Sequence, residues 1–244
     1  MRKFCLLSAT ACMIAGSIFF TGCSKDKDGS GGSTFKSITA KVVDGKDYDS
    51  LIDEVIAVIV YDDGDEGAGF AVESGPYKNG GFTIDFPESV SSKYLDYIFD
   101  DPEEGVKVSD EKTQGAILFF SGYSKSGEWV GLFNHEKETK TSYSEAEYLY
   151  VDRNCTVKGT EKDGKYTYTY DVSLKKGWNI IYYTETDLTE TYSSKNPGGL
   201  EWYFYDSDNF KSYQMESAIR RSAIKSSLGK SKLLQKINFN EITK

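Results

Sequence analysis

Residues 165–174 read Lys-Tyr-Thr-Tyr-Thr-Tyr-Asp-Val-Ser-Leu, with an aromatic or aliphatic side chain at every second position from Tyr166 to Leu174. Because successive side chains of a β-strand point to opposite faces, the aromatic and aliphatic ones share a face and the polar ones share the other. This alternation predicts a half-buried strand. Asp163-Gly164 directly before it suits a tight turn, since glycine readily adopts the positive φ that such turns need. Residues 154–160 are therefore predicted to pair with the strand as a hairpin.

Short runs of β-branched and aromatic residues, separated by glycine-containing turns, continue this pattern through the chain. Further strands are predicted near 36–43, 55–61, 69–74, 82–86, 116–123, 129–133, 148–152, 178–184 and 200–205. The run 55–60 is apolar on both faces, which predicts a strand covered on both sides. A short helix is expected at 91–99, where Tyr94, Leu95 and Ile98 have helical spacing.

This pattern predicts an all-β fold, a mostly antiparallel β-sandwich of about ten strands, with a β-barrel as the alternative. The sandwich domain is expected to cover residues 34–210. An acidic break at 100–105 also allows two closely packed halves on either side of it.

The C-terminal extension, residues 211–244, differs from the body in charge. It holds eight basic and two acidic side chains, for a net charge of +6, whereas residues 23–210 carry −17. This contrast favours an extension, expected to be helical, that lies against the acidic body or against another anionic surface.

The N-terminus has the organisation of a signal peptide. Arg2 and Lys3 precede an uncharged apolar stretch, 4–20, that is short for a membrane span. Phe20-Thr21-Gly22-Cys23 resembles the lipobox of bacterial lipoproteins, although an aliphatic residue is usual where Phe20 stands. The resemblance implies a signal peptide at 1–22 and a lipid on Cys23. An ordinary secretory signal is the alternative. The polar, glycine-rich residues after the cysteine, up to 33, are expected to form a flexible tether.

The composition limits the classes of function. The chain has 244 residues, 39% of them hydrophobic and 14% aromatic, which is enough for a globular core. Its net charge of −9 argues against nucleic acid as a partner, because phosphate contacts need a basic surface. Cys5 and Cys12 leave with the signal peptide and Cys23 carries lipid, so Cys155 has no disulfide partner in the mature chain and is expected to be buried.

Residues for catalysis or metal binding are few. Gly122-Tyr123-Ser124-Lys125-Ser126 lacks the second glycine of a nucleophile elbow, His135 is expected to be a solvated loop residue, and the mature chain lacks the Cys and His ligands of a usual zinc site. Carboxylates offer weak calcium candidates in two turns: Asp62, Asp63, Asp65, Asp206 and Asp208. No catalytic residue, metal or other cofactor is predicted.

Aromatic side chains are the remaining candidates for a binding site. On a sheet with one buried face, half of them would be exposed as platforms for sugar rings or protein partners. Packing across strands is the competing explanation, since aromatic residues are common in strands. The candidate ligand-binding residues are Trp129, Trp178, Trp202, Tyr203 and Tyr205.

Taken together, the lipobox, the tether and the aromatic body resemble the cell-envelope lipoproteins of Bacteroidota. Residues 36–86, ending in Phe82-Thr83-Ile84-Asp85-Phe86-Pro87, are similar to transthyretin-like or immunoglobulin-like modules. The resemblance implies a protein anchored to the outer membrane through Cys23, facing either the cell surface or the periplasm. Three functions follow as hypotheses: non-enzymatic binding of a glycan or an envelope protein, structural or adhesive contact between proteins, and carboxylate-dependent hydrolysis.

Overall fold

The computed structural model describes residues 33–61, 68–99, 102 and 104–207. Fifteen strands and two short 3₁₀ helices lie in this part of the chain: β1 (Ser33–Thr34), β2 (Ser37–Lys41), η1 (Gly45–Tyr48), β3 (Glu54–Tyr61), β4 (Ala68–Pro76), β5 (Gly81–Asp85), η2 (Ser92–Tyr94), β6 (Asp96–Tyr97), β7 (Val106–Val108), β8 (Gln114–Tyr123), β9 (Trp129–Glu138), β10 (Tyr143–Val151), β11 (Cys155–Asp163), β12 (Tyr166–Leu174), β13 (Gly177–Glu185), β14 (Thr189–Ser193) and β15 (Glu201–Asp206). The predicted all-β class is confirmed.

One long sheet organises the fold. Its thirteen strands follow the order β4-β3-β8-β9-β10-β13-β14-β12-β11-β7, with β1, β6 and β15 paired alongside. The path has two ends, so the sheet is not closed into the alternative barrel. Its strand pairs are antiparallel except for β12 and β14, which run parallel.

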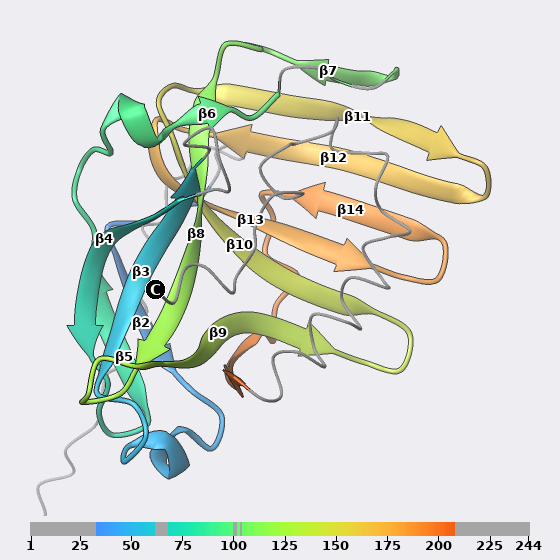
Figure 1. Cartoon of the computed structure of the whole chain (residues 1–244). Coiled ribbons are helices and arrows are strands. Elements are labelled where there is room, and N and C mark those ends of the chain that lie inside the picture. The colour runs from blue at the N-terminus through green and yellow to red at the C-terminus, as the bar shows by residue number, and fades with distance from the viewer. Residues whose placement is uncertain (1–32, 62–67, 100–101, 103, 208–244) are drawn as a thin grey trace, which may run out of the picture.

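The long sheet changes direction at β8. Residues 120–123 of this strand pair with β9, whereas residues 115–118 pair with β10. In Figure 1, β3, β4 and β8 accordingly run nearly upright, and β11 to β14 run across them. The far half of the sheet therefore extends away from the part that packs against a second layer.

The second layer is the two-stranded sheet of β2 and β5. Phe82 of β5 lies 5.8 Å from Phe120, 5.1 Å from Phe133 and 5.5 Å from Trp202, measured between ring centroids. These partners belong to β8, β9 and β15, so the small sheet covers the near half of the long one. Burial of these large aromatic rings supplies much of the driving force for the packing. The predicted sandwich arrangement is confirmed for this half.

A second hydrophobic cluster occupies the far half. Nine buried side chains from β10 to β14 form it, including Tyr168, Tyr170 and Val172. β11 and β12 pair in antiparallel register through Asp163↔Tyr166, as the Asp163-Gly164 turn predicts. Tyr168, Tyr170, Val172 and Leu174 are buried, which confirms the half-buried strand expected from the alternation at residues 165–174.

Two expectations for individual elements are wrong. The predicted helix at 91–99 is η2 followed by β6, because Leu95 has extended φ and ψ and Asp96 pairs with Gly115 of β8. Sequence patterning also missed β14, a polar five-residue strand whose Glu190 and Tyr192 point to the buried side. The signal peptide, most of the tether and the C-terminal extension (211–244) lie outside the described residues.

Candidate functional site: a tyrosine–glutamate face

The far half of the long sheet carries tyrosines and carboxylates together on one side, which we call the tyrosine–glutamate face. Residues directly opposite each other in paired strands project to the same side, so the register defines its members. They come from β10 to β14 and the adjoining end of β9: Glu136, Glu138, Tyr143, Glu145, Glu147, Leu149, Val151, Cys155, Val157, Gly159, Glu161, Asp163, Tyr166, Tyr168, Tyr170, Val172, Leu174, Gly177, Asn179, Ile181, Tyr183, Glu185, Glu190 and Tyr192.

Four tyrosines form a row across this face. The rings of Tyr170 and Tyr192 stack with centroids 5.4 Å apart and planes 7° from parallel. Tyr192 lies 5.2 Å from Tyr183, which in turn lies 6.5 Å from Tyr143. The row thus crosses β12, β14, β13 and β10, and each contact adds to the energy of burying the rings. The parallel pairing of β12 with β14 creates the row, since it sets Tyr170 opposite Tyr192.

Glu136 is a buried carboxylate at one end of the face. Its Oε2 accepts hydrogen bonds from the Tyr143 hydroxyl at 2.9 Å and from Asn134 Nδ2 at 3.3 Å. Its Oε1 accepts one from the Tyr205 hydroxyl. The Tyr143 hydroxyl also lies 3.0 Å from Glu145 Oε2. Phenol donors from two neighbouring strands therefore support this carboxylate in a site that exposes little of it to water.

The negative charge of Glu190 is less well compensated than that of Glu136. The Glu190 side chain is 5% exposed, and its Oε2 has no hydrogen-bond partner among the described residues. Burial, together with the negative charge of Glu185 directly opposite on β13, raises the pKa of Glu190 to about 7. Burial, followed by the charges of Glu190 and Glu185, raises the pKa of the Tyr183 hydroxyl between them. A proton or a cation at this place would relieve the repulsion.

Charge on the face has one sign. Eight of the strand positions that project to this side in β10–β14 and the end of β9 hold Asp or Glu, and none holds Lys or Arg. On the opposite side of β11, by contrast, Lys158 and Lys162 project, and Lys158 forms an ion pair with Asp171 of β12. The two sides of one sheet therefore differ in electrostatic potential, and the tyrosine–glutamate face favours cationic ligands.

The tryptophans predicted as ligand platforms lie mostly in the core. Trp178 is 4% exposed and donates its indole N–H to the Pro87 carbonyl at 2.8 Å, and Trp202 is 6% exposed. Trp129 is half-buried at the start of β9. Tyr203 and Tyr205 are also half-buried, and the Tyr205 hydroxyl joins the Glu136 site. The structure therefore does not bring the five predicted residues together as one exposed platform.

His135 is a strand residue, so its prediction as a solvated loop histidine is wrong. It lies within β9, opposite Trp202 of β15, and its ring stacks on the indole with centroids 4.9 Å apart. Its Nδ1 lies 2.7 Å from the Tyr148 hydroxyl. Burial lowers the pKa of this imidazole. The polar residues that follow Phe133 concealed the continuation of the strand.

Most of the predicted calcium ligands lie outside the described residues. Asp206 ends β15, whereas Asp62, Asp63, Asp65 and Asp208 lie outside the described residues. Within residues 33–61, 68–99 and 104–207, no three His, Cys, Asp or Glu side chains gather in an arrangement that could hold a metal ion.

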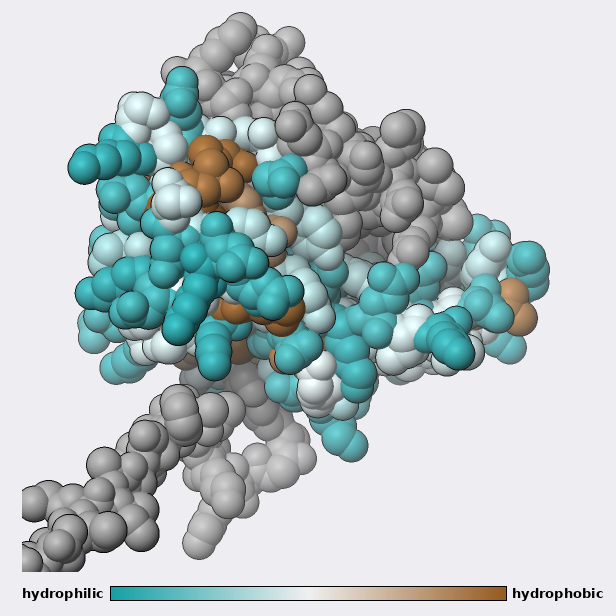
Figure 2. Space-filling model, turned by 90° about the horizontal axis from the view of Figure 1, so that it is seen from below, coloured by the Kyte–Doolittle hydropathy of each residue, from teal (hydrophilic) through white to brown (hydrophobic). Residues whose placement is uncertain are grey.

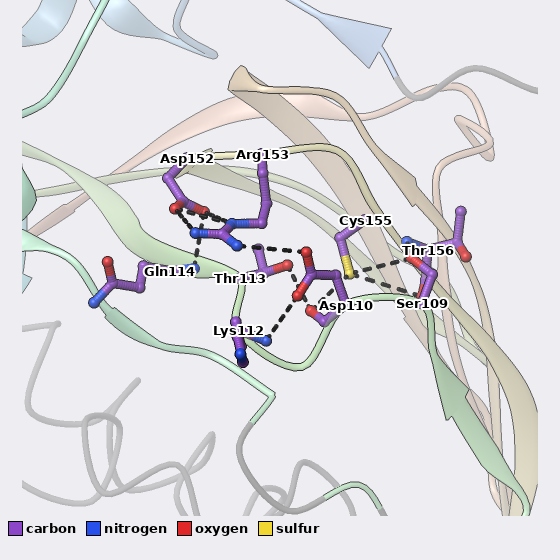
Figure 3. Close-up of polar contacts among 9 residues, drawn as sticks. All are labelled: Ser109, Asp110, Lys112, Thr113, Gln114, Asp152, Arg153, Cys155 and Thr156. Atoms are coloured by element: carbon purple, nitrogen blue, oxygen red, sulfur yellow. Dashed lines mark hydrogen bonds and ion pairs between the residues drawn. The ribbon is translucent and has the colours of Figure 1, made fainter.

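A polar cluster around Arg153 ties the start of β8 to the turn between β10 and β11 (Figure 3). The Arg153 guanidinium contacts Asp152 at 2.8 Å and Asp110 at 3.5 Å, and the Gln114 backbone N–H donates to Asp152 at 3.0 Å. The hydrogen bond from Arg153 is the main cause of the lowered pKa of Asp152. Cys155 beside this cluster is buried, as predicted. These contacts hold the loop before β8 against the turn between β10 and β11, so the role of the cluster is structural.

The rest of the surface that the described residues form exposes few large apolar side chains. In the view of Figure 2 it is largely hydrophilic, with apolar residues in small separate areas. Large exposed apolar side chains in the described part are Leu51, Tyr97 and Leu188, which belong to separate segments. Of the helices that the described residues form, none has the length and apolar character to cross a bilayer.

Sequence reasoning missed the tyrosine–glutamate face, although the alternation within some of its strands is visible in the sequence. The alternation at 166–174 identifies one strand of it, and Tyr143, Glu145 and Glu147 alternate in the same way. Their juxtaposition depends on the strand order, which no local pattern encodes. Comparison of the chain with protein-family models, curated proteins and solved structures finds no match.

Proposed function

We propose that this chain is a lipid-anchored protein of the bacterial cell envelope with a non-enzymatic binding role. In this proposal Cys23 carries the lipid, residues 24–32 form the tether up to Ser33 of β1, and the tyrosine–glutamate face binds a protein partner. The partner contacts it through a segment in which Lys or Arg side chains alternate with apolar ones. The observation that carries the proposal is the set of eight carboxylates among tyrosines on one sheet face, with no basic side chain projecting from the same strand positions.

A polypeptide suits this face better than a glycan does. The glycan hypothesis depends on exposed tryptophans, and Trp178 and Trp202 are buried in the core. The phenols of Tyr143 and Tyr183 hydrogen-bond to neighbouring carboxylates, so they present polar edges beside apolar rings. Basic side chains with long aliphatic stems complement both features, because the stem covers the ring and the head meets the carboxylate.

The anchor is tested by cell fractionation and mass spectrometry of the native N-terminus. We expect the wild-type chain in the membrane fraction, with a lipid mass on a Cys23 that is the first residue. Cys23→Ser should release the protein from the membrane. Cys155→Ala is the matched control, since it removes the buried thiol and leaves the anchor in place. An unmodified Cys23 in a soluble wild-type protein would contradict the proposal.

The binding face is tested by photo-crosslinking in intact cells of the native host. A photoreactive phenylalanine analogue replaces either Tyr166, at the rim of the face, or Thr169, on the opposite side of the same strand. We expect adducts with an envelope protein from position 166 and not from 169, joined to a peptide that contains Lys or Arg. The additional changes Glu145→Gln and Glu147→Gln should reduce the yield. Equal adducts from both positions, or none from either, would reject this face as the binding surface.

A further inference from the structure

The buried side chains of the tyrosine–glutamate face need a covering layer that the described strands do not supply. Tyr168 at its centre is 0% exposed, and eight more side chains of this cluster are buried. Partly buried neighbours packed against it, within the described ranges, belong to the same long sheet, except for Ile98 and Phe99. One face of a single sheet cannot bury its own apolar side chains, since they all project the same way. Another part of the structure has to cover them.

The charge of the face selects the kind of cover. Eight carboxylates project from its strand positions without a basic residue, and Glu190 holds a buried Oε2 that no described donor reaches. A purely apolar cover would leave the buried Glu190 Oε2 with neither a hydrogen-bond donor nor a counter-charge, which is unfavourable. The cover therefore has to bring cations and hydrogen-bond donors as well as apolar side chains.

We propose that the C-terminal segment of the same chain, residues 211–244, is this cover and lies across the tyrosine–glutamate face. The segment carries a net charge of +6, with Lys230, Lys232 and Lys236 set among Leu233, Leu234 and Ile237. Its lysines and arginines pair with the carboxylates at the rim, such as Glu145, Glu147 and Glu185, and its apolar side chains cover the tyrosine row.

The chain leaves the described part in a suitable place. β15 ends at Asp206, and Tyr205 just before it donates to Glu136, which belongs to the face. Strands are spaced about 4.8 Å apart, so the path from β9 to β11 across the sheet is roughly 25 Å. An extended chain covers this distance with about eight residues. Residues 208–244 are long enough to cross the face several times.

This inference deepens the proposed function and rests on it in one respect: a protein partner that binds the same face has to displace the segment or share the face with it. The segment then acts as an intramolecular competitor, and its high local concentration makes the free face a minor state. Binding is thereby restricted to partners whose basic segment competes with the chain's own.

Zero-length carbodiimide cross-linking of the full mature chain tests the docking, because it joins a lysine amine to a carboxylate only when they touch. A mixture of unlabelled and ¹⁵N-labelled protein separates links within one chain from links between copies. We expect links from Lys230, Lys232 or Lys236 to Glu145, Glu147 or Glu185, and only within one chain. Links between differently labelled chains would assign the cover to a second copy and overturn the proposal.

Two charge variants show whether the docking is specific. Arg220→Glu with Arg221→Glu leaves every lysine in place but weakens the attraction, so the links should be lost. Lys158→Glu with Lys162→Glu makes the same charge change on the opposite side of β11 and should leave them unchanged. Links to Asp171 on that opposite side, as abundant as those to the face, would also overturn the proposal.

The experiments test the docked segment and the protein partner separately. Intrachain links without envelope adducts at position 166 would keep the docked segment and reject the partner. Envelope adducts without intrachain links would keep the partner and reject the docked segment.

Discussion

Replacing the buried carboxylate of Glu190 by an amide should stabilise the protein, and the gain should grow with pH. The pKa of Glu190 is raised to about 7 from the ordinary 4.5. The folded chain therefore keeps a proton that the unfolded chain releases near its ordinary pKa. Stability contributed by this protonated group is fully present below the ordinary value and is lost as the pH rises to about 7. Each pKa unit corresponds to about 1.4 kcal/mol, so the total loss is about 3 kcal/mol.

Glu190→Gln removes this titration because the amide cannot ionise. The free energies of unfolding of variant and wild type should be similar below about pH 4, and the variant should be more stable by about 3 kcal/mol at about pH 8. Urea unfolding of the mature chain measures the difference, with the fluorescence of the buried Trp178 and Trp202 as the signal. The comparison between variant and wild type cancels the other titrating groups.

The control is Asp187→Asn, which removes an exposed carboxylate from the turn between β13 and β14. Its effect should stay within about 0.5 kcal/mol, because the side chain lies at the surface. A Glu190→Gln difference that is independent of pH, or a variant that loses stability above neutral pH, would refute the account of Glu190 as a desolvated and repelled carboxylate.

Three further predictions concern other parts of the fold. His135 is the one histidine of the chain, so its imidazole signal in an NMR titration is unambiguous. Its midpoint should lie below 6.5 because burial disfavours the charged ring. A midpoint at or above 6.5 would contradict burial as the dominant influence on this ring. Tyr168→Ala should lower the free energy of unfolding by about 3–5 kcal/mol, since it empties a fully buried site. Tyr97→Ala is the control: this residue is 58% exposed, so its replacement should cost less than about 0.5 kcal/mol. Similar losses in the two variants would contradict the burial of Tyr168 in the second hydrophobic cluster. Gly159→Ala should detach β7, because a Cβ at this positive φ of 144° would lie 2.1 Å from the Gly105 carbonyl oxygen. Hydrogen exchange at Val106–Val108 measures that detachment, and unchanged protection there would speak against the tight approach of the two strands.

Local sequence patterns predicted the elements that depend on neighbouring residues alone. Alternation along 166–174 predicted both the strand and its buried side, and Asp163-Gly164 predicted the turn of the hairpin. The helix expected at 91–99 failed for the opposite reason. Its apolar spacing suited a helix, but pairing of Asp96 with Gly115 offered the backbone hydrogen bonds in an extended form. His135 was misplaced because β9 continues past its last apolar residue and is held by β15 and β10.

The candidate site illustrates what the sequence could not provide. Trp178 and Trp202 were recognisable as strand residues, yet alternation says only that neighbouring side chains oppose each other, not which side the fold covers. The packing of β2 and β5 against the long sheet decided that both indoles are buried. Their burial depends on contacts between segments far apart in the chain.

The sequence by itself determined that this chain is built of strands, where many of them run, and that a basic C-terminal segment follows an acidic body. Periodicity and turn residues are local properties, so a single sequence reveals them. The tertiary structure alone decided that β12 lies parallel to β14 and that Glu185 faces Glu190 across neighbouring strands. Strand order arises from the joint burial of distant segments, and it is this order that gathers tyrosines and carboxylates into one face.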